Sequence, residues 1–171
     1  MDDREEFTRW ASQRQLALLR TAVLICGDHH RAEDLVQEAL TQVALRWRKL
    51  RDGHPDAYAR RVIVNGNVSW WRRHRREVVS PEPDEPAQVP AAVHAGEDHS
   101  DRRIALDTAL AALTPRQRAV IVLRYYEDLG ERETAEVLGV SVGTVKSQTH
   151  MALRRLREGS PHLAVMLEDL R

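Results

Sequence analysis

The sequence is poor in residue types on which several common kinds of protein depend. Its 171 residues include one cysteine, one phenylalanine, eight glycines and seven prolines. Cys26 has no second cysteine to pair with, so an intrachain disulfide is excluded and a reducing compartment is favoured. No apolar run is long enough to span a bilayer, and the N-terminus is acidic. We therefore expect no signal peptide, no membrane insertion and a cytoplasmic protein.

Signals for β-strands are also missing. The β-branched runs at 62–64 and 120–122 lie inside longer helical patterns, and no alternating stretch has a useful length. The formal net charge is zero, so total charge says nothing about nucleic acid. Only Lys49 and Lys146 are lysines, and the remaining bases are arginines, whose planar guanidinium suits bidentate phosphate binding. The sequence predicts an all-α fold.

An acidic segment divides the chain. Residues 77–101 contain seven acidic residues, with Asp101 as the last of them, and four prolines, but no lysine or arginine. This composition predicts a linker, because prolines prevent a long helix and like charges extend a chain. The expected organisation is two small helical domains, 1–76 and 102–159, joined by this acidic, proline-containing linker. A tail at 160–171 could form a short amphipathic helix.

The N-terminal domain is expected to contain three helical stretches, over 2–26, 31–50 and 55–76. The second has a clear apolar stripe and an opposite polar face. The third ends in tryptophans interleaved with arginines, a composition typical of surfaces that follow a phosphate backbone and stack bases. A solvated basic helix end with structural tryptophans is the alternative.

The C-terminal domain carries the most specific pattern, over 113–157. Thr114, Pro115 and Gln117 predict a capping box at the start of a helix that extends to about residue 127. A short helix is predicted at 131–138, and Gly139 directly after it can adopt the left-handed conformation that commonly ends a helix. Ser141 can then cap a third helix. The spacing of a small residue, a glycine and an apolar residue then predicts a helix-turn-helix.

The third helix of this unit has two different faces. Val145, Thr149, Ala152 and Leu156 share the side predicted to be buried. No acidic residue lies between Glu136 and Glu158, so the opposite side is small, polar and basic. We predict a helix that enters the major groove of DNA, although an ordinary amphipathic helix would show a similar pattern.

Taken together, these motifs resemble the extracytoplasmic-function (ECF) class of bacterial RNA polymerase sigma factors, close to the actinobacterial SigE-like group. The similarity rests on AEDLVQEAL at 32–40, RRVIVNGNVSWWRRHRR at 60–76 and the helix-turn-helix region at 113–157. It implies an alternative sigma factor that binds core RNA polymerase, recognises the minus-35 and minus-10 promoter elements and helps to melt promoter DNA. An anti-sigma factor is a further partner that the resemblance allows, although no residue requires one.

The resemblance also implies three groups of site residues. The polymerase-binding residues are expected to be Asp34, Gln37, Glu38 and Thr41. The residues that contact the minus-10 element are expected to be His54, Tyr58, Arg61, Asn65, Asn67, Trp70, Trp71, Arg72, Arg73, Arg75 and Arg76. The residues that contact the minus-35 element are expected to be Ser141, Gly143, Thr144, Lys146, Ser147, His150, Arg154 and Arg155.

Two other functions have to be weighed. A free-standing helix-turn-helix regulator would share the C-terminal unit, but a receiver domain before it would need alternating strands, which are not predicted. An enzyme would need a phosphate loop, a metal-ligand spacing or a nucleophile motif, and none is found, so no catalysis and no cofactor are expected. Cys26, His29 and His30 lie together, but three such residues without a fourth ligand do not predict a metal site.

Overall fold

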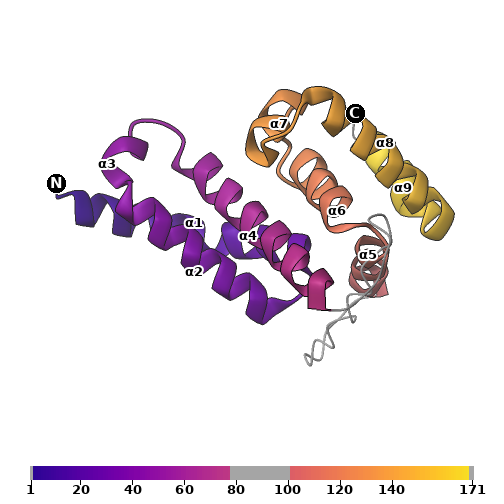
Figure 1. The fold of residues 1–171 in the computed structure, drawn as a ribbon, viewed down its shortest axis with the longest axis horizontal. Helices are drawn as coiled ribbons and strands as arrows, with labels where there is room; N and C mark the ends of the chain where they lie inside the picture. The colour runs from indigo at the N-terminus through magenta and orange to yellow at the C-terminus, as the bar shows by residue number, and fades with distance from the viewer. Residues whose placement is uncertain (1, 78–100, 170–171) are drawn as a thin grey trace.

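The computed structural model describes residues 2–77 and 101–169, and in these ranges the secondary structure is helical, with no strand (Figure 1). The prediction of an all-α fold is confirmed. The predicted acidic linker lies outside the described residues except at its two ends, and the side chains of residues 75–77 and 101–102 also lie outside them. Within the described ranges, no helix is long and apolar enough to cross a membrane.

Three long helices form the N-terminal half: α1 (Asp3–Cys26), α2 (His29–Leu45) and α4 (Pro55–Glu77). Asp28 caps α2, because its side chain accepts a hydrogen bond of 2.7 Å from the backbone N–H of Arg31. Helices α2 and α4 approach closely at Gly66, where an added Cβ would lie 2.7 Å from a methyl carbon of Leu35. Glycine at this position therefore permits the contact between the two helices.

The helix predicted over 31–50 is in fact two helices, and the prediction of a single one was wrong. Arg46 leaves the helical conformation, with φ −117° and ψ 12°, and a short helix α3 (Trp47–Leu50) follows. The break turns the indole of Trp47 towards α1, where its ring centroid lies 5.6 Å from those of both Phe7 and Trp10. Trp47 is only 8% exposed, so burial of this large ring accompanies the change in helix direction.

In the described part of the C-terminal half, residues 101–169, six helical elements follow one another. They are α5 (Asp101–Ala111), α6 (Pro115–Ile121), η1 (Val122–Tyr126), α7 (Glu131–Leu138), α8 (Val142–Gly159) and α9 (Pro161–Asp169). The helix predicted over 115–127 changes character at residue 122, because η1 is a π-helical turn in which Glu127 N–H donates to the carbonyl of Val122. The tail forms α9, which contacts α8.

The local signals of the helix-turn-helix are confirmed. Thr114 and Gln117 form the predicted capping box at the start of α6. Gly139 ends α7 with φ 65°, in the left-handed region, and Ser141 caps α8 by accepting from the N–H of Thr144 at 3.1 Å. Val145 is fully buried in the angle between α7 and α8.

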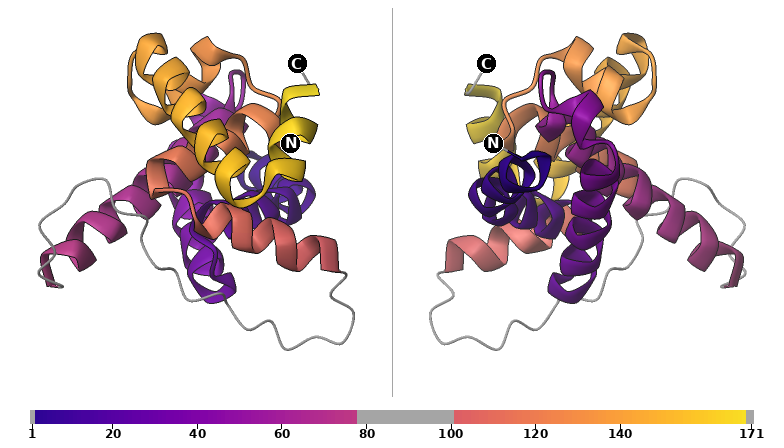
Figure 2. Two further views of the ribbon diagram at one scale, coloured as in Figure 1. Left: turned by 90° about the vertical axis from the view of Figure 1, so that its right-hand side faces the viewer. Right: turned by 90° about the vertical axis from the view of Figure 1, so that its left-hand side faces the viewer.

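The two halves are in contact, and they share one hydrophobic core. Ile63 and Val64 of α4 belong to the same buried cluster as Ala119 of α6 and Leu123 of η1. Figure 1 shows α6 and α7 beside α4, and Figure 2 shows the last turns of α4 extending beyond the other helices. A second cluster lies between α5, α8 and α9.

Buried polar contacts also join the halves. Arg118 of α6 is 4% exposed, and its Nε donates to the carbonyl of Leu24 near the end of α1. Glu127, which follows η1, forms an ion pair of 2.7 Å with Arg60 of α4 and accepts a hydrogen bond from the hydroxyl of Thr21. All three contacts connect residues that are far apart in the sequence, so local patterns do not reveal them.

Candidate nucleic-acid and partner interfaces

The acidic face of α2 is fully available to a partner. Asp34, Gln37, Glu38 and Thr41 are all exposed, while Ala32, Val36, Ala39 and Val43 of the same helix are buried. Among the described contacts, Glu38 accepts from the amide of Gln42, at 2.8 Å. Exposed carboxylates and an amide on one helix can accept charge-assisted hydrogen bonds from arginines of another protein.

The predicted minus-10 region begins at the loop between α3 and α4. His54, Arg61 and Asn65 are exposed, and Tyr58 is half-buried beside Arg46, whose guanidinium carbon lies 5.7 Å from the Tyr58 ring centroid. A pocket of about 480 Å³ is lined by His54, Tyr58 and Arg61. This pocket provides an aromatic wall and basic groups, which suit an unstacked base and its phosphate.

The other side of this pocket belongs to the C-terminal half. Glu133, Glu136 and Val137 of α7 line it opposite α4. Glu133 also accepts a hydrogen bond from the backbone N–H of Gly130, which holds it at the start of α7. Because carboxylates repel phosphates, α7 in this position disfavours a nucleic-acid strand in the pocket.

Asn67, one of the predicted minus-10 residues, is buried in this structure. It is 0% exposed, and its side-chain oxygen accepts a hydrogen bond from Nη2 of Arg31 on α2. It lies one turn after Ile63 and Val64, on the buried face of α4. Asn67 therefore binds the half-buried Arg31 and presents no surface to DNA in this structure.

The two tryptophans near the end of α4 are also less available than the sequence suggests. The guanidinium carbon of Arg31 lies 3.7 Å from the centroid of Trp70, and the ring of His74 stacks on Trp70 at 3.7 Å. Trp71 meets Trp70 edge to face at 4.9 Å, and both are half-buried. A base could stack on Trp70 only by displacing one of these groups. Arg72 and Arg73 are exposed, whereas the side chains of Arg75 and Arg76 lie outside the described residues.

Helix α8 presents the predicted outer face to solvent. Its exposed members are Ser141, Gly143, Lys146, Ser147, His150 and Arg154, and Thr144 is partly exposed. Arg154 is 74% exposed and lies 3.6 Å from Glu158, while Lys146 lies 3.6 Å from Glu131. Long side chains in such weak pairs can exchange them for phosphates or base edges.

Arg155, one of the predicted minus-35 residues, is less exposed than Arg154. It is half-buried, and its Nη1 donates to the side-chain oxygen of Gln117 at 3.2 Å. Arg155 therefore connects α8 to the capping box of α6, whereas its neighbour Arg154 is mostly exposed. Position 155 lies 100° around the helix from position 154, close to the border between the exposed and buried faces of α8. The contact with Gln117 decides how much of its side chain is exposed.

Three charged residues with structural importance were not singled out from the sequence. Arg31, Arg60 and Arg118 each make a contact with a distant element in the interior or at its margin. Burial lowers the pKa of Arg118 to about 10, so this side chain remains charged at neutral pH. No sequence signal separates these arginines from exposed ones, because their partners are a backbone carbonyl or residues on other helices.

A metal site finds no support in the residues that the structure describes. There, no cluster of His, Cys, Asp and Glu could hold an ion. Cys26 is buried and its thiol donates to the carbonyl of Asp28 at 3.1 Å, and burial raises the pKa of that thiol. His29 and His30 are exposed beside Glu33.

The fold and these surfaces define an all-helical protein of the helix-turn-helix class with a second helical half. Comparison with known proteins makes the class more specific. The family model "Sigma-70 region 2" matches residues 8–77, and "Sigma-70, region 4" matches residues 103–156.

Individual relatives match over most of the chain. The RNA polymerase sigma-E factor of Streptomyces coelicolor is 44% identical over 156 residues, covering 90% of this chain and 85% of the relative. The ECF RNA polymerase sigma factor SigL of Mycobacterium tuberculosis is 36% identical over 152 residues, covering 82% and 80%. The sigma factor RpoE of Bartonella quintana, solved in complex with the anti-sigma factor NepR, has a TM-score of 0.71 and 26% identity, covering 90% and 96%. The chain belongs to the ECF family of RNA polymerase sigma factors.

Proposed function

We propose that this protein is an alternative sigma factor that binds core RNA polymerase, recognises the minus-35 and minus-10 elements and helps to melt promoter DNA. The observation that supports this most strongly is the presence on one chain of both sigma-70 regions, 2 and 4, with the α2 face and the outer face of α8 both exposed. The named relatives are sigma factors, and we propose no catalytic activity. The site of action would be the cytoplasm, where bacterial promoters are transcribed.

The surfaces divide this work between the two halves. Residues 1–76 would bind polymerase through α2 and the minus-10 strand through the 51–54 loop and α4. Residues 102–159 would bind the minus-35 duplex through α8, with 77–101 as the connection and 160–171 as a tail without an assigned role. Two weak DNA contacts joined through polymerase gain from effective concentration, so neither half has to bind promoter DNA tightly alone.

Reconstitution with core polymerase tests the function directly. Holoenzyme made with the protein should transcribe a genomic library from a limited set of start sites that share upstream motifs, and core polymerase alone should not. A free-standing regulator, the second candidate, would instead bind an operator tightly without polymerase. Tight duplex binding by the isolated protein, with no polymerase-dependent start sites, would therefore favour the regulator.

An anti-sigma factor is a further proposed partner. The similar solved structure is that of a sigma factor bound to such a protein. In the present chain, α7 already lies against the pocket formed by His54, Tyr58 and Arg61, so a protein that holds the two halves together would keep this pocket covered. Co-purification from a native host, followed by identification of the bound protein, would test for this partner.

Substitution of Arg154 should weaken minus-35 binding. Arg154→Ala removes a mostly exposed cation from the outer face of α8. If the guanidinium contacts phosphate, the dependence of log K on log salt should fall by about one unit. If it contacts a base edge, the loss should be about 1–3 kcal/mol and depend on sequence. Holoenzyme binding to a minus-35 duplex over a salt series measures both, with Arg103→Ala, an exposed arginine on α5, as the matched control.

Asn65→Ala should impair promoter opening rather than duplex binding. Asn65 is exposed on α4, although the preceding residue, Val64, is buried. The Asn65 amide can pair with the edge of an unstacked base. Permanganate reactivity of thymines in the minus-10 region should fall by roughly tenfold, if one good base contact is lost. A normal permanganate footprint with Asn65→Ala holoenzyme would contradict the assignment.

A further inference from the structure

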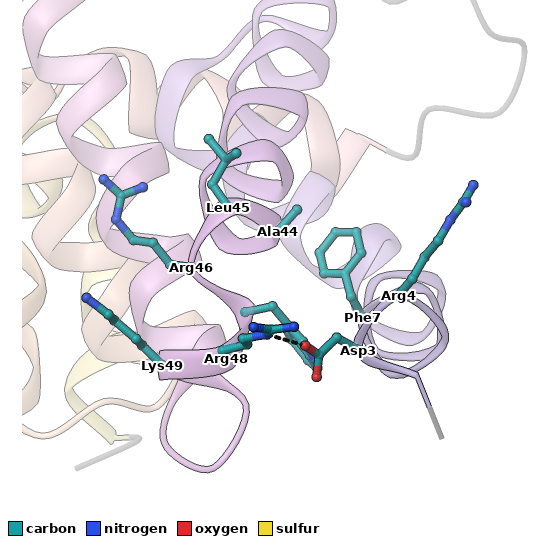
Figure 3. A pocket seen from close by; sticks show the side chains of 9 residues that line it. Asp3, Arg4, Phe7, Ala44, Leu45, Arg46, Arg48 and Lys49 are labelled. Carbon is teal, nitrogen blue, oxygen red and sulfur yellow. Dashed lines mark hydrogen bonds and ion pairs between the residues drawn. The ribbon is translucent and has the colours of Figure 1, made fainter.

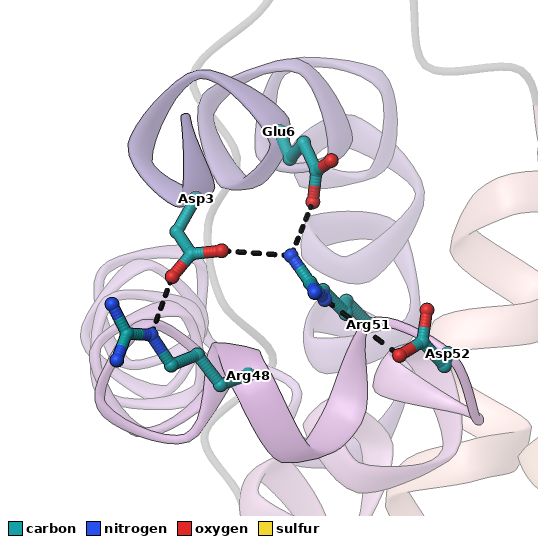
Figure 4. A network of polar contacts seen from close by, with 5 residues as sticks. All are labelled: Asp3, Glu6, Arg48, Arg51 and Asp52. Carbon is teal, nitrogen blue, oxygen red and sulfur yellow. Dashed lines mark hydrogen bonds and ion pairs between the residues drawn. The ribbon is translucent and has the colours of Figure 1, made fainter. Parts of the chain in front are cut away.

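Helix α1 holds one end of the 51–54 loop through a network of ion pairs. Asp3 accepts from Nε of Arg48 at 2.5 Å and from Nη1 of Arg51 at 2.8 Å. Glu6, one turn further along α1, lies 3.3 Å from the same Nη1 of Arg51. Figure 4 shows the Arg51 guanidinium reaching between the two carboxylates. The first residue of the loop is therefore fastened to α1.

The other end of the loop is held by the same helix. Asp56 lies in the first turn of α4, directly after the loop and Pro55. One of its carboxylate oxygens accepts from the indole N–H of Trp10 at 3.2 Å, and the other accepts from Nη2 of Arg14 at 2.7 Å. Residues 3, 6, 10 and 14 follow one face of α1, so a single helix face contacts both sides of the loop.

Apolar contacts support the same arrangement. Phe7 and Trp10 of α1 pack on Trp47 of α3, with ring centroids 5.6 Å from it. A pocket of about 560 Å³ lies beside them, lined by Phe7 and Trp47, and Figure 3 shows Asp3 reaching Arg48 at its edge. The aromatic rings fix the distance between α1 and α3, and the ion pairs fix the direction of the loop.

The tip of the loop is exposed, and its residues Gly53 and His54 line the pocket that α7 borders on the other side. Asp52, Gly53 and His54 are exposed, and Gly53 N–H donates to the carbonyl of Leu50 at 3.0 Å. The loop is thus anchored at its ends and open at its tip. A loop that is fixed before binding loses less conformational entropy when the ligand binds, so less of the binding free energy is spent on ordering it.

We propose that α1 is a positioning element for minus-10 recognition, with Asp3, Glu6, Trp10 and Arg14 as positioning residues that act through the 51–54 loop. This proposal rests on the proposed function, because it assigns the loop to the minus-10 strand. In this proposal the four positioning residues do not contact DNA themselves. They hold the loop in the conformation that receives an unstacked base, whereas a merely solvated acidic helix end would only repel the DNA strand weakly.

The test depends on whether the affinity for the minus-10 strand rises or falls. Asp3→Asn with Glu6→Gln removes two negative charges, so simple electrostatics predicts tighter DNA binding. Positioning predicts the opposite, a weakening of about fivefold, since several small ion-pair contributions are lost together. The variant Asp3→Glu with Glu6→Asp keeps both charges and should restore most of the affinity. Glu5→Gln, which removes one exposed acid from the same turn of α1, controls for the electrostatic effect of each lost charge.

The measurement is made on holoenzyme with a fluorescent single-stranded oligonucleotide that spans the minus-10 element of a promoter mapped by start-site sequencing. Binding to a minus-35 duplex and association with core polymerase should be unchanged in the same variants. Trp10→Phe would remove the N–H donor to Asp56 but also shrink a ring that packs on Trp47. Arg14→Gln removes the charged partner of Asp56 at a half-exposed side chain, so it tests the second anchor without disturbing the aromatic packing.

Each outcome separates this proposal from the function on which it rests. Equal or tighter strand binding by the double variant, with wild-type binding intact, would overturn the positioning role alone. Equal losses in strand, duplex and polymerase binding would overturn it as well, because they would indicate general unfolding. Wild-type holoenzyme that fails to bind the strand would overturn the proposed function together with this inference.

Discussion

Charge reversal at Asp34 and Glu38 is expected to abolish association with core RNA polymerase while leaving the fold of the protein intact. Both carboxylates are exposed on α2, on the side opposite its buried alanines and valines. Lysines at these positions would face the arginines that we expect on the partner, and like charges placed together at an interface cost several kcal/mol. The affinity should fall by at least about 100-fold, or close to 3 kcal/mol.

Co-purification and a titration of labelled protein with core polymerase measure this effect. A matched control reverses two exposed acids on other helices, Glu5 of α1 and Asp169 of α9, with the same total change in charge. Thermal unfolding of the free variant should match that of the wild type, because neither Asp34 nor Glu38 contributes to the core. Undiminished co-purification of the Asp34→Lys, Glu38→Lys variant would remove α2 from the polymerase interface.

Arg118→Ala is expected to lower the free energy of unfolding by about 2–4 kcal/mol. The Arg118 side chain is almost completely buried between α6 and the end of α1, where its Nε donates to the carbonyl of Leu24. Its removal leaves that carbonyl without this donor and leaves a cavity beside Gly27, where an added Cβ would lie 2.9 Å from Nη1 of Arg118. Both losses occur at the contact between the two halves.

Urea unfolding followed by circular dichroism measures this change. Arg116→Ala, at an exposed position on the same helix, controls for the loss of one charge and one helix-forming residue. The pKa of Arg118 is lowered by burial to about 10, below its unfolded value, so the group is charged in both states near pH 7. The difference between the variants should therefore be independent of pH around neutrality, and an unchanged urea midpoint would contradict the structural role of Arg118.

Local chemistry explains which features of the fold could be predicted. Gly139, Ser141 and the Thr114–Gln117 capping box act on the backbone within four residues of themselves, and each is found where the sequence predicts it. The buried face of α8 follows in the same way from the 100° step of a helix, and Val145, Thr149, Ala152 and Leu156 are all buried.

Local patterns give no information on residues whose environment is made by other helices. Asn67 was assigned to DNA because amides suit base edges, but Arg31 of α2 occupies its side-chain oxygen. Arg155 was assigned to the outer face of α8, but Gln117 of α6 binds it. The helix expected to continue through Arg46 breaks there, and Trp47 packs against Phe7 and Trp10 of α1. In each case a tertiary contact overrides a reasonable local preference.

The sequence by itself determined the all-helical class, the helix-turn-helix and the family, because these depend on periodicity, caps and short motifs. Only the tertiary structure decided that the two halves share a core, that Arg118 and Glu127 join them, and that α1 anchors the 51–54 loop. The reason is separation along the chain: Arg118 and Leu24 are 94 residues apart, and Thr21 and Glu127 are 106 apart. No local pattern encodes which distant partner a buried arginine or glutamate will meet.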